Sequence, residues 1–164
     1  MLMKLKNLWI MCGPSGAGKS TWIKNHMPGA RVISRDQIRF SLLKDDEDYF
    51  AHEQEVLRIF YRRIQCAIEY DAINNIVVDA THLTPKARKT LLSNLKYLHM
   101  VNVNAISIEA DLETCLKQNA QRTGRAQVPE TVIKNMHASY IIPTKEEGFN
   151  EIRRYYNGTN LDEQ

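Results

Sequence analysis

The sequence predicts an α/β fold with a mainly parallel central sheet of about five strands flanked by helices. Short apolar runs alternate with segments of helical periodicity along the chain, which is the pattern of successive strand–helix units. The 164 residues are the size of one domain, and the hydrophobic share of 43% and charged share of 25% are ordinary for a globular protein. We therefore expect a single domain over residues 1–164.

Charge and cysteine content exclude several classes of protein. The 22 Lys and Arg against 19 Asp and Glu leave a net charge of +3, too weak for a broadly basic nucleic-acid-binding surface. Cys12, Cys66 and Cys115 are too few and too scattered for a disulfide framework and fit a reducing cytoplasm. No apolar run has the length of a membrane span, and the N-terminus lacks a signal-peptide cleavage site. We expect a cytoplasmic protein.

Strands are predicted where short runs of apolar residues lie between polar turns. They are Asn7–Cys12, Arg31–Ser34, Ile76–Asp79, Val101–Ile108 and, as an edge strand, Glu151–Tyr156. The run Ile76–Asp79 is almost wholly apolar, as in parallel strands buried on both faces. Residues 157–164 read as a polar tail that begins with a turn.

Helices are predicted between these strands from apolar periodicity and capping residues. They run from Lys19 to about His26, Asp36 to Leu43, Glu53 to Asp71, Pro85 to Leu95, Asp111 to Gln121 and Pro129 to Tyr140. Asp36 is expected as the N-cap or first-turn residue of its helix. Thr84 followed by Pro85 is a typical N-cap and first helical position. Residues 111–140 are expected to form a helical lid.

The segment Gly13–Ser20, GPSGAGKS, matches the pattern GxxxxGK[ST] between a strand and a helix, the context of a P-loop. Glycines let backbone N–H groups wrap a phosphate, and the following helix adds its positive end. Lys19 can reach the β- and γ-phosphates and the Ser20 hydroxyl can bind Mg²⁺. The predicted donor-binding residues are Gly13, Ser15, Gly16, Ala17, Gly18, Lys19, Ser20 and Thr21. A nucleoside triphosphate, by default ATP, is therefore expected with Mg²⁺.

Asp36 follows the second strand, at the edge where α/β sheets bind ligands. A carboxylate there can act as the general base for an attacking hydroxyl. Arg39 lies three residues further on, on the same helix face, where an arginine can hold a phosphate of the acceptor. The alternative is that Asp36 only caps the helix and pairs with Arg39.

Asp79 ends the apolar third strand, where it can orient Mg²⁺ through water or hold an active-site arginine. The alternative is a residue that caps the next turn. His82 follows closely and is more simply a structural hydrogen-bonding residue or part of the acceptor-site wall than a catalyst.

Arginines elsewhere in the chain have both functional and structural interpretations. Arg122 and Arg125, in the segment RTGR, can close over the triphosphate and neutralise its charge, but loop arginines are also commonly only solvated. Two basic helix segments are interpreted as solvated faces, although any of their residues could line a nucleic-acid track. They are Lys86, Arg88 and Lys89, and Arg58, Arg62 and Arg63.

The order of these motifs resembles the 5′-kinase domain of phage-type polynucleotide kinases from about Leu8 to Phe149. The P-loop is common to many NTPases, whereas SRDQIR and RTGRAQVPE are more specific to these kinases. The resemblance implies transfer of the ATP γ-phosphate to a 5′-hydroxyl of DNA or RNA. In that scheme Lys19, Asp36 and Arg122 are catalytic. Arg39 holds the 3′-phosphate beside the acceptor hydroxyl, Asp79 organises the site, and Arg125 is a second donor-side arginine.

This sequence departs from the pattern at two positions: Gln118 replaces an arginine of the lid helix, and His82 replaces an asparagine. Both changes bear on the acceptor. No phosphatase or ligase module is expected within the chain, so such partners would be separate chains. If the gene is carried by a phage, the expected location is the host cytoplasm. The alternatives are a small-molecule kinase, for a nucleoside, sugar or antibiotic, and a non-catalytic NTP-binding module.

Overall fold

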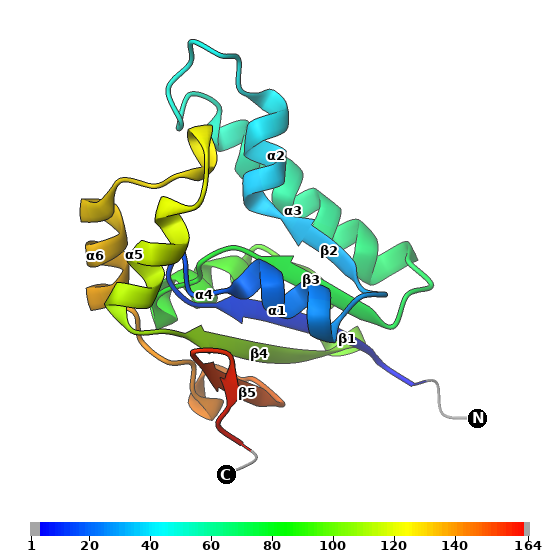
Figure 1. Ribbon diagram of the computed structural model, residues 1–164. Helices are drawn as coiled ribbons and strands as arrows, with labels where there is room; N and C mark the ends of the chain where they lie inside the picture. The colour runs from blue at the N-terminus through cyan, green and yellow to red at the C-terminus, as the bar shows by residue number, and fades with distance from the viewer. Residues whose placement is uncertain (1–3, 163–164) are drawn as a thin grey trace.

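The computed structural model describes residues 4–162 and contains a six-stranded sheet in the order β2-β3-β1-β4-β5-β6 (Figure 1). The strands are β1 (Lys6–Cys12), β2 (Arg31–Ser34), β3 (Asn75–Asp79), β4 (Val101–Glu109), β5 (Ile152–Tyr156) and β6 (Thr159–Asn160). Neighbouring strands from β2 to β5 are parallel, and β6 is antiparallel to β5. The predicted α/β fold is confirmed.

Six α-helices and three single turns of 3₁₀-helix connect the described strands. The helices are α1 (Lys19–His26), α2 (Arg35–Leu42), α3 (Glu53–Tyr70), α4 (Pro85–Ser93), α5 (Leu112–Ala120) and α6 (Glu130–Ser139). The 3₁₀ turns are η1 (Leu98–Met100), η2 (Gly124–Ala126) and η3 (Lys145–Glu147). The predicted cap at Thr84 is present, and Asp111, expected as the first residue of its helix, is also a cap; both side chains accept a hydrogen bond from a first-turn N–H. Asp36 lies in the first turn of α2, and Ser34 is the cap.

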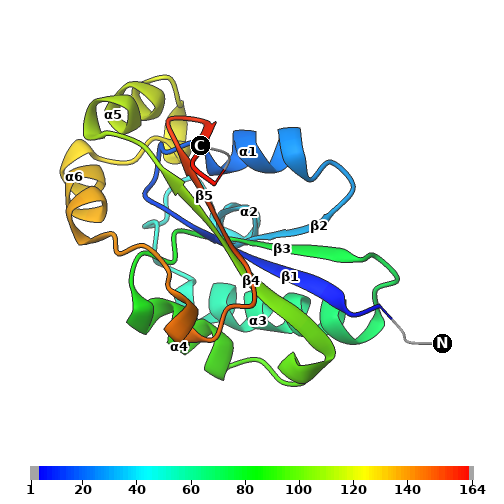
Figure 2. The same ribbon diagram turned by 90° about the horizontal axis from the view of Figure 1, so that it is seen from below.

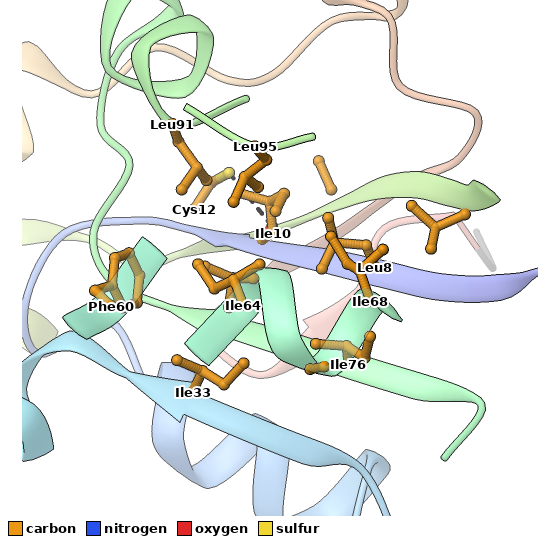
Figure 3. Packing of buried hydrophobic residues seen from close by; sticks show 14 of the residues in the cluster. Leu8, Ile10, Cys12, Ile33, Phe60, Ile64, Ile68, Ile76, Leu91 and Leu95 are labelled. Atoms are coloured by element: carbon orange, nitrogen blue, oxygen red, sulfur yellow. Dashed lines mark hydrogen bonds between the residues drawn. The ribbon is translucent and has the colours of Figure 1, made fainter. Parts of the chain in front are cut away.

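The helices cover both faces of the sheet because successive residues of each buried strand point to opposite faces. Leu8 and Ile10 of β1 pack with α3 and α4, whereas Trp9 and Met11 pack with α1 and α5. Figure 2 shows α1 and α5 on one side of the sheet and α3 and α4 on the other. Figure 3 shows the first of these two cores, in which Phe60 of α3 and other side chains meet those of β1.

The expected number of strands was one too few, because Asn157–Gly158 forms a tight hairpin rather than the start of a polar tail. Both residues have positive φ, 47° and 81°, as in the turns that match the twist of paired strands. The hairpin places β6 against β5. The part of the predicted tail at residues 163–164 lies outside the described residues.

Arg88 is not part of a solvated helix face, which corrects the interpretation from sequence. Its side chain is 1% exposed and is paired with Glu147 of η3, 2.7 Å away. It also donates a hydrogen bond to the His82 carbonyl, at 2.9 Å. The basic pattern of α4 looked solvated because the partner carboxylate lies 59 residues further along the chain. Lys86 and Lys89 are exposed as expected.

None of the helices within residues 4–162 combines the length and the apolar character that crossing a membrane requires.

Candidate active site

The P-loop connects β1 to α1 at the carboxyl edge of the sheet, where two glycines let it lie against neighbouring backbone. Gly13 has φ 149° and Gly16 has φ 82°. A Cβ atom at Gly13 would collide with the carbonyl oxygen of Ile108, and one at Gly16 with that of Cys115. Since L-residues rarely adopt such φ values, both positions require glycine for conformation as well as for space.

Backbone N–H groups of this loop are available to an anion. Six of them have no hydrogen-bond acceptor within residues 4–162: those of Ser15, Gly16, Gly18, Lys19, Ser20 and Thr21. Three of the six belong to the first turn of α1, where helix geometry leaves donors unpaired and the helix dipole is positive. This donor set fits the phosphate groups of a nucleoside triphosphate.

Lys19 lies at the centre of the site, and its Nζ donates hydrogen bonds to the carbonyls of Gly13 and Pro14, each 2.8 Å away. Burial lowers the pKa of Lys19 to about 8, against an opposing effect of Asp79. Arg122 lowers this pKa further and Asp36 raises it. These mutual effects show that the fold brings together four residues predicted from different parts of the sequence.

Asp79 ends β3 beside Ser34, the last residue of β2, which is its register partner. Burial raises the pKa of Asp79, while Lys19 lowers it. Within the described residues no group of three or more His, Cys, Asp or Glu side chains could hold a metal ion. A Mg²⁺ ion at this site would therefore depend on oxygens of the nucleotide together with Ser20 and Asp79.

Asp36 is held through only one of its carboxylate oxygens. Its Oδ1 accepts a hydrogen bond from Arg39 Nη1 and another from the Tyr49 hydroxyl, the latter at 2.8 Å. Its Oδ2 has no partner within residues 4–162, and the side chain is 59% exposed. The carboxylate is thus oriented but keeps one oxygen free to accept a proton.

Arg39 is buried beside Asp36, and its guanidinium group already has hydrogen-bond partners. Its side chain is 5% exposed, and its Nη2 lies 2.8 Å from Glu53 on α3. The Tyr49 ring lies against the guanidinium, 4.4 Å from its centre. Burial acts to lower the pKa of Arg39, but Glu53, Tyr49 and Asp36 together outweigh it and raise this pKa. Holding an acceptor phosphate, as predicted from sequence, would require Arg39 to leave these partners, so its placement favours a role in orienting Asp36.

Three residues of this cluster were missed by the sequence analysis: Arg35, Tyr49 and Glu53. Glu53 pairs with both Arg35 and Arg39. Arg35 Nε is buried without a hydrogen-bond partner, and this side chain lies close enough to His82 to lower its pKa. The motif SRD drew attention to Asp36. Nothing in the sequence indicated that the counterion of Arg39 is Glu53, which lies 14 residues further along the chain on α3.

His82 lies beneath the P-loop and is 8% exposed. Its Nδ1–H donates to the Met11 carbonyl at 2.7 Å, and the neighbouring Thr81 carbonyl accepts from the Gly13 N–H at 2.9 Å. These bonds tie the end of β3 to the end of β1. The placement indicates that His82 supports the P-loop, and a direct contact with the acceptor stays a prediction.

His82 should make folding less favourable as the pH falls below neutrality. Burial lowers its pKa from 6.5 to about 4, so between these values the unfolded chain binds a proton that the folded chain does not. The free energy of unfolding should therefore fall by about 3 kcal/mol as the pH falls from 6.5 to 4. His82→Asn should lose this dependence, since its amide can donate to Met11 and Asn tolerates the φ of 42°. Urea unfolding of both proteins at pH 7 and pH 4.5 tests this, and an equal pH dependence would contradict it.

The segment predicted to be a lid contains α5, η2 and α6. Asn119 is buried and fixes its loop, donating to the Val128 carbonyl at 2.7 Å and accepting from the Val128 N–H at 2.9 Å. Arg122 has no side-chain partner within residues 4–162 and faces Lys19 closely enough to affect its pKa. Its contact with the donor phosphates stays a prediction.

Arg125 lies elsewhere than expected. Its Nη2 donates to three carbonyls of the loop after α2, those of Lys44, Asp45 and Glu47, at 2.5, 2.7 and 3.0 Å. The bonds connect the lid to the acceptor side, and Figure 1 shows these two segments meeting above the sheet. A contact of Arg125 with donor phosphates, as predicted, would require it to leave these carbonyls.

A pocket of about 430 Å³ adjoins the P-loop between α1, α5 and the β5–β6 turn. Gly18, Thr21 and Asn157 are among the residues that line it. Trp22 also lines it, and its indole Nε1 is buried without a hydrogen-bond partner. The His26 ring stacks on Trp22 at 4.7 Å. A partly apolar pocket next to a phosphate site is suited to a nucleotide base.

Comparison with known proteins gives one family: the family described as AAA domain matches residues 8–143. No curated protein matches the chain.

Solved structures share the fold at low sequence identity. A protein of Chloroflexus aurantiacus aligns over 99% of this chain and 90% of its own, at 13% identity and a TM-score of 0.72. A chain of the Pnkp1/Rnl/Hen1 RNA repair complex aligns at 17% identity and a TM-score of 0.70. The alignment covers 84% of this chain but only 45% of that one. A sugar kinase of a Janibacter species aligns over 93% and 86%, at 14% identity and a TM-score of 0.63.

Proposed function

The chain belongs to the AAA domain family, with the fold of P-loop kinases, and on this premise we propose that it is an ATP-dependent polynucleotide 5′-hydroxyl kinase. It transfers the γ-phosphate to the 5′-hydroxyl of DNA or RNA. The observation that carries the proposal is the Asp36 carboxylate, which is fixed through Oδ1 and free at Oδ2 within electrostatic range of Lys19.

The residues of the site divide between donor and acceptor. The free N–H groups of the P-loop and Lys19 hold the donor phosphates, and the pocket beside Trp22 takes the base. ATP supplies the phosphoryl group. Ser20 and, through water, Asp79 would hold Mg²⁺, which would neutralise negative charge on the phosphates. Arg122 adds positive charge where negative charge spreads over the transferred group. Asp36 Oδ2 accepts the proton of the acceptor hydroxyl.

A phosphate next to the acceptor hydroxyl requires an arginine with free donors. We assign this contact to Arg35, whose side chain is 33% exposed and, among the described residues, pairs only with Glu53, whereas Arg39 is 5% exposed and is engaged by Asp36, Tyr49 and Glu53. This arrangement supports a polynucleotide acceptor, which supplies such a phosphate, over a neutral one.

A small-molecule kinase is the second candidate, favoured by the likeness in fold to a sugar kinase. The free oxygen of Asp36 argues against the third, a non-catalytic NTP-binding module, since binding alone does not require a base.

The test is a panel of acceptors incubated with the protein, labelled ATP and Mg²⁺. DNA and RNA oligonucleotides with a 5′-hydroxyl should become labelled, and the same oligonucleotides with a 5′-phosphate should not. Transfer to a nucleoside or a sugar with no transfer to any oligonucleotide would establish the second candidate instead. Binding of ATP with no transfer to any acceptor would leave only the third candidate, a non-catalytic NTP-binding module.

A further inference from the structure

A groove of about 690 Å³ follows the outer edge of the sheet, between β2 and α3. We call it the arginine groove, because it is lined by Arg31 on β2 and by Arg58, Arg62 and Arg63 on α3. The single acidic residue in its lining is Asp71. The whole chain carries a net charge of only +3, so positive charge is concentrated here.

Two of these arginines have no counterion within residues 4–162. Arg31 pairs with Asp71 at 2.7 Å, and Arg58 pairs with Glu55 one turn before it. Arg62 and Arg63 are exposed and make no ion pair or side-chain hydrogen bond. Arg58 and Arg62 are also four residues apart on one helix, a spacing at which like charges destabilise the helix. Their spacing does not stabilise the helix, which is consistent with a role in binding an anion.

The arginine groove begins beside the candidate general base. Ser34 and Gln37, which line one end, flank Asp36 in the chain. The start of α3 lies at this end, because Glu53 pairs with Arg35 and Arg39. The other end is marked by Tyr70, whose side chain is 79% exposed. From Arg58 to Tyr70 the helix rises about 18 Å, and Figure 1 shows α3 and β2 running side by side away from α2.

We propose that the arginine groove binds the phosphate backbone of a single-stranded polynucleotide acceptor as it leaves the active site. Arg62 and Arg63 contact phosphates, and the exposed Tyr70 ring offers a surface on which a base can stack. The proposal rests on the function proposed above and adds to it where the acceptor runs. Such a local cluster of positive charge would let a chain of weak net charge bind a polynucleotide.

The first test is binding of a fluorescent 5′-hydroxyl octanucleotide, measured by anisotropy at several salt concentrations. The variant R62Q/R63Q should bind about tenfold more weakly at low salt, and its slope of log affinity against log salt should be shallower by about 1.4. The matched control is K86Q/K89Q, which removes the same charge from exposed positions of α4 outside the groove. No binding by the wild-type protein, or equal effects of the two variants, would overturn the proposal.

The second test separates the groove from the proposed function. In the kinase assay, R62Q/R63Q should raise KM for the octanucleotide about tenfold while leaving kcat, and KM for a nucleoside 3′-monophosphate, unchanged. If the wild-type protein phosphorylated both acceptors and R62Q/R63Q had the wild-type KM for each of them, the groove proposal would be overturned. The proposed function would still stand. Salt-dependent binding through Arg62 and Arg63 without any phosphoryl transfer would support the groove and refute the function. Equal displacement of the octanucleotide by polyglutamate of matched charge would instead indicate an acidic protein partner and overturn the proposal.

Discussion

Replacing Asp36 with Asn should lower kcat by about 10²–10⁴-fold, the usual contribution of a general base. The amide oxygen of the D36N side chain can still accept hydrogen bonds from Arg39 and Tyr49, as Asp36 does through Oδ1. The amide nitrogen, in the place of Oδ2, has no lone pair for a proton. The variant should therefore fold and bind ATP normally, which calorimetry can measure beside the kinetic assay.

The matched control for D36N is D46N, which removes an exposed carboxylate ten residues further on, in the loop after α2. It should retain wild-type kcat. If D36N kept full activity, or lost ATP binding in proportion to activity, Asp36 would not be the base.

Replacing Glu53 with Gln should lower both stability and kcat. Glu53 is the shared counterion of Arg35 and Arg39, and the Arg39 side chain is 5% exposed. Removing one partner of a largely buried ion pair leaves uncompensated charge and costs about 3 kcal/mol in the free energy of unfolding. Because Arg39 also holds Asp36, kcat should fall while ATP affinity stays unchanged. Urea unfolding, kinetics and ATP titration measure the three effects.

E55Q is the control on the same helix, since Glu55 and its partner Arg58 are 44% and 60% exposed. An exposed pair of this kind is worth about 0–1 kcal/mol, so E55Q should resemble the wild type in the stability and activity measurements. If E53Q and E55Q behaved alike, the ion pairs of Glu53 would not be what orients Asp36.

Local patterns predicted most of the secondary structure. The helix over Lys19–His26 and the strand over Arg31–Ser34 were predicted with the bounds observed, because apolar periodicity and capping act within a few residues. The hairpin that forms β6 was missed because its second strand has only two residues, too short to show a pattern. The end of α4 was placed two residues too far, at Leu95 instead of Ser93.

The donor side of the candidate site was predictable for the same reason. A P-loop is a contiguous segment whose function depends on backbone N–H groups, so the motif carries its own geometry. Asp79 and Arg122 could also be placed near Lys19, since the carboxyl ends of parallel strands and the loops beyond them meet at one edge. Their mutual effects on the pKa of Lys19 agree with that expectation.

By itself, the sequence determined the α/β fold, the P-loop and the position of Asp36 at the start of a helix. Only the tertiary structure decided which charged side chains are free. Arg39 and Arg88 are engaged by Glu53 and Glu147, whereas Arg62 and Arg63 face an open groove. The physical reason is that an arginine's role depends on its burial and on a counterion brought from a distant part of the chain. Neither leaves a signal in the residues around it.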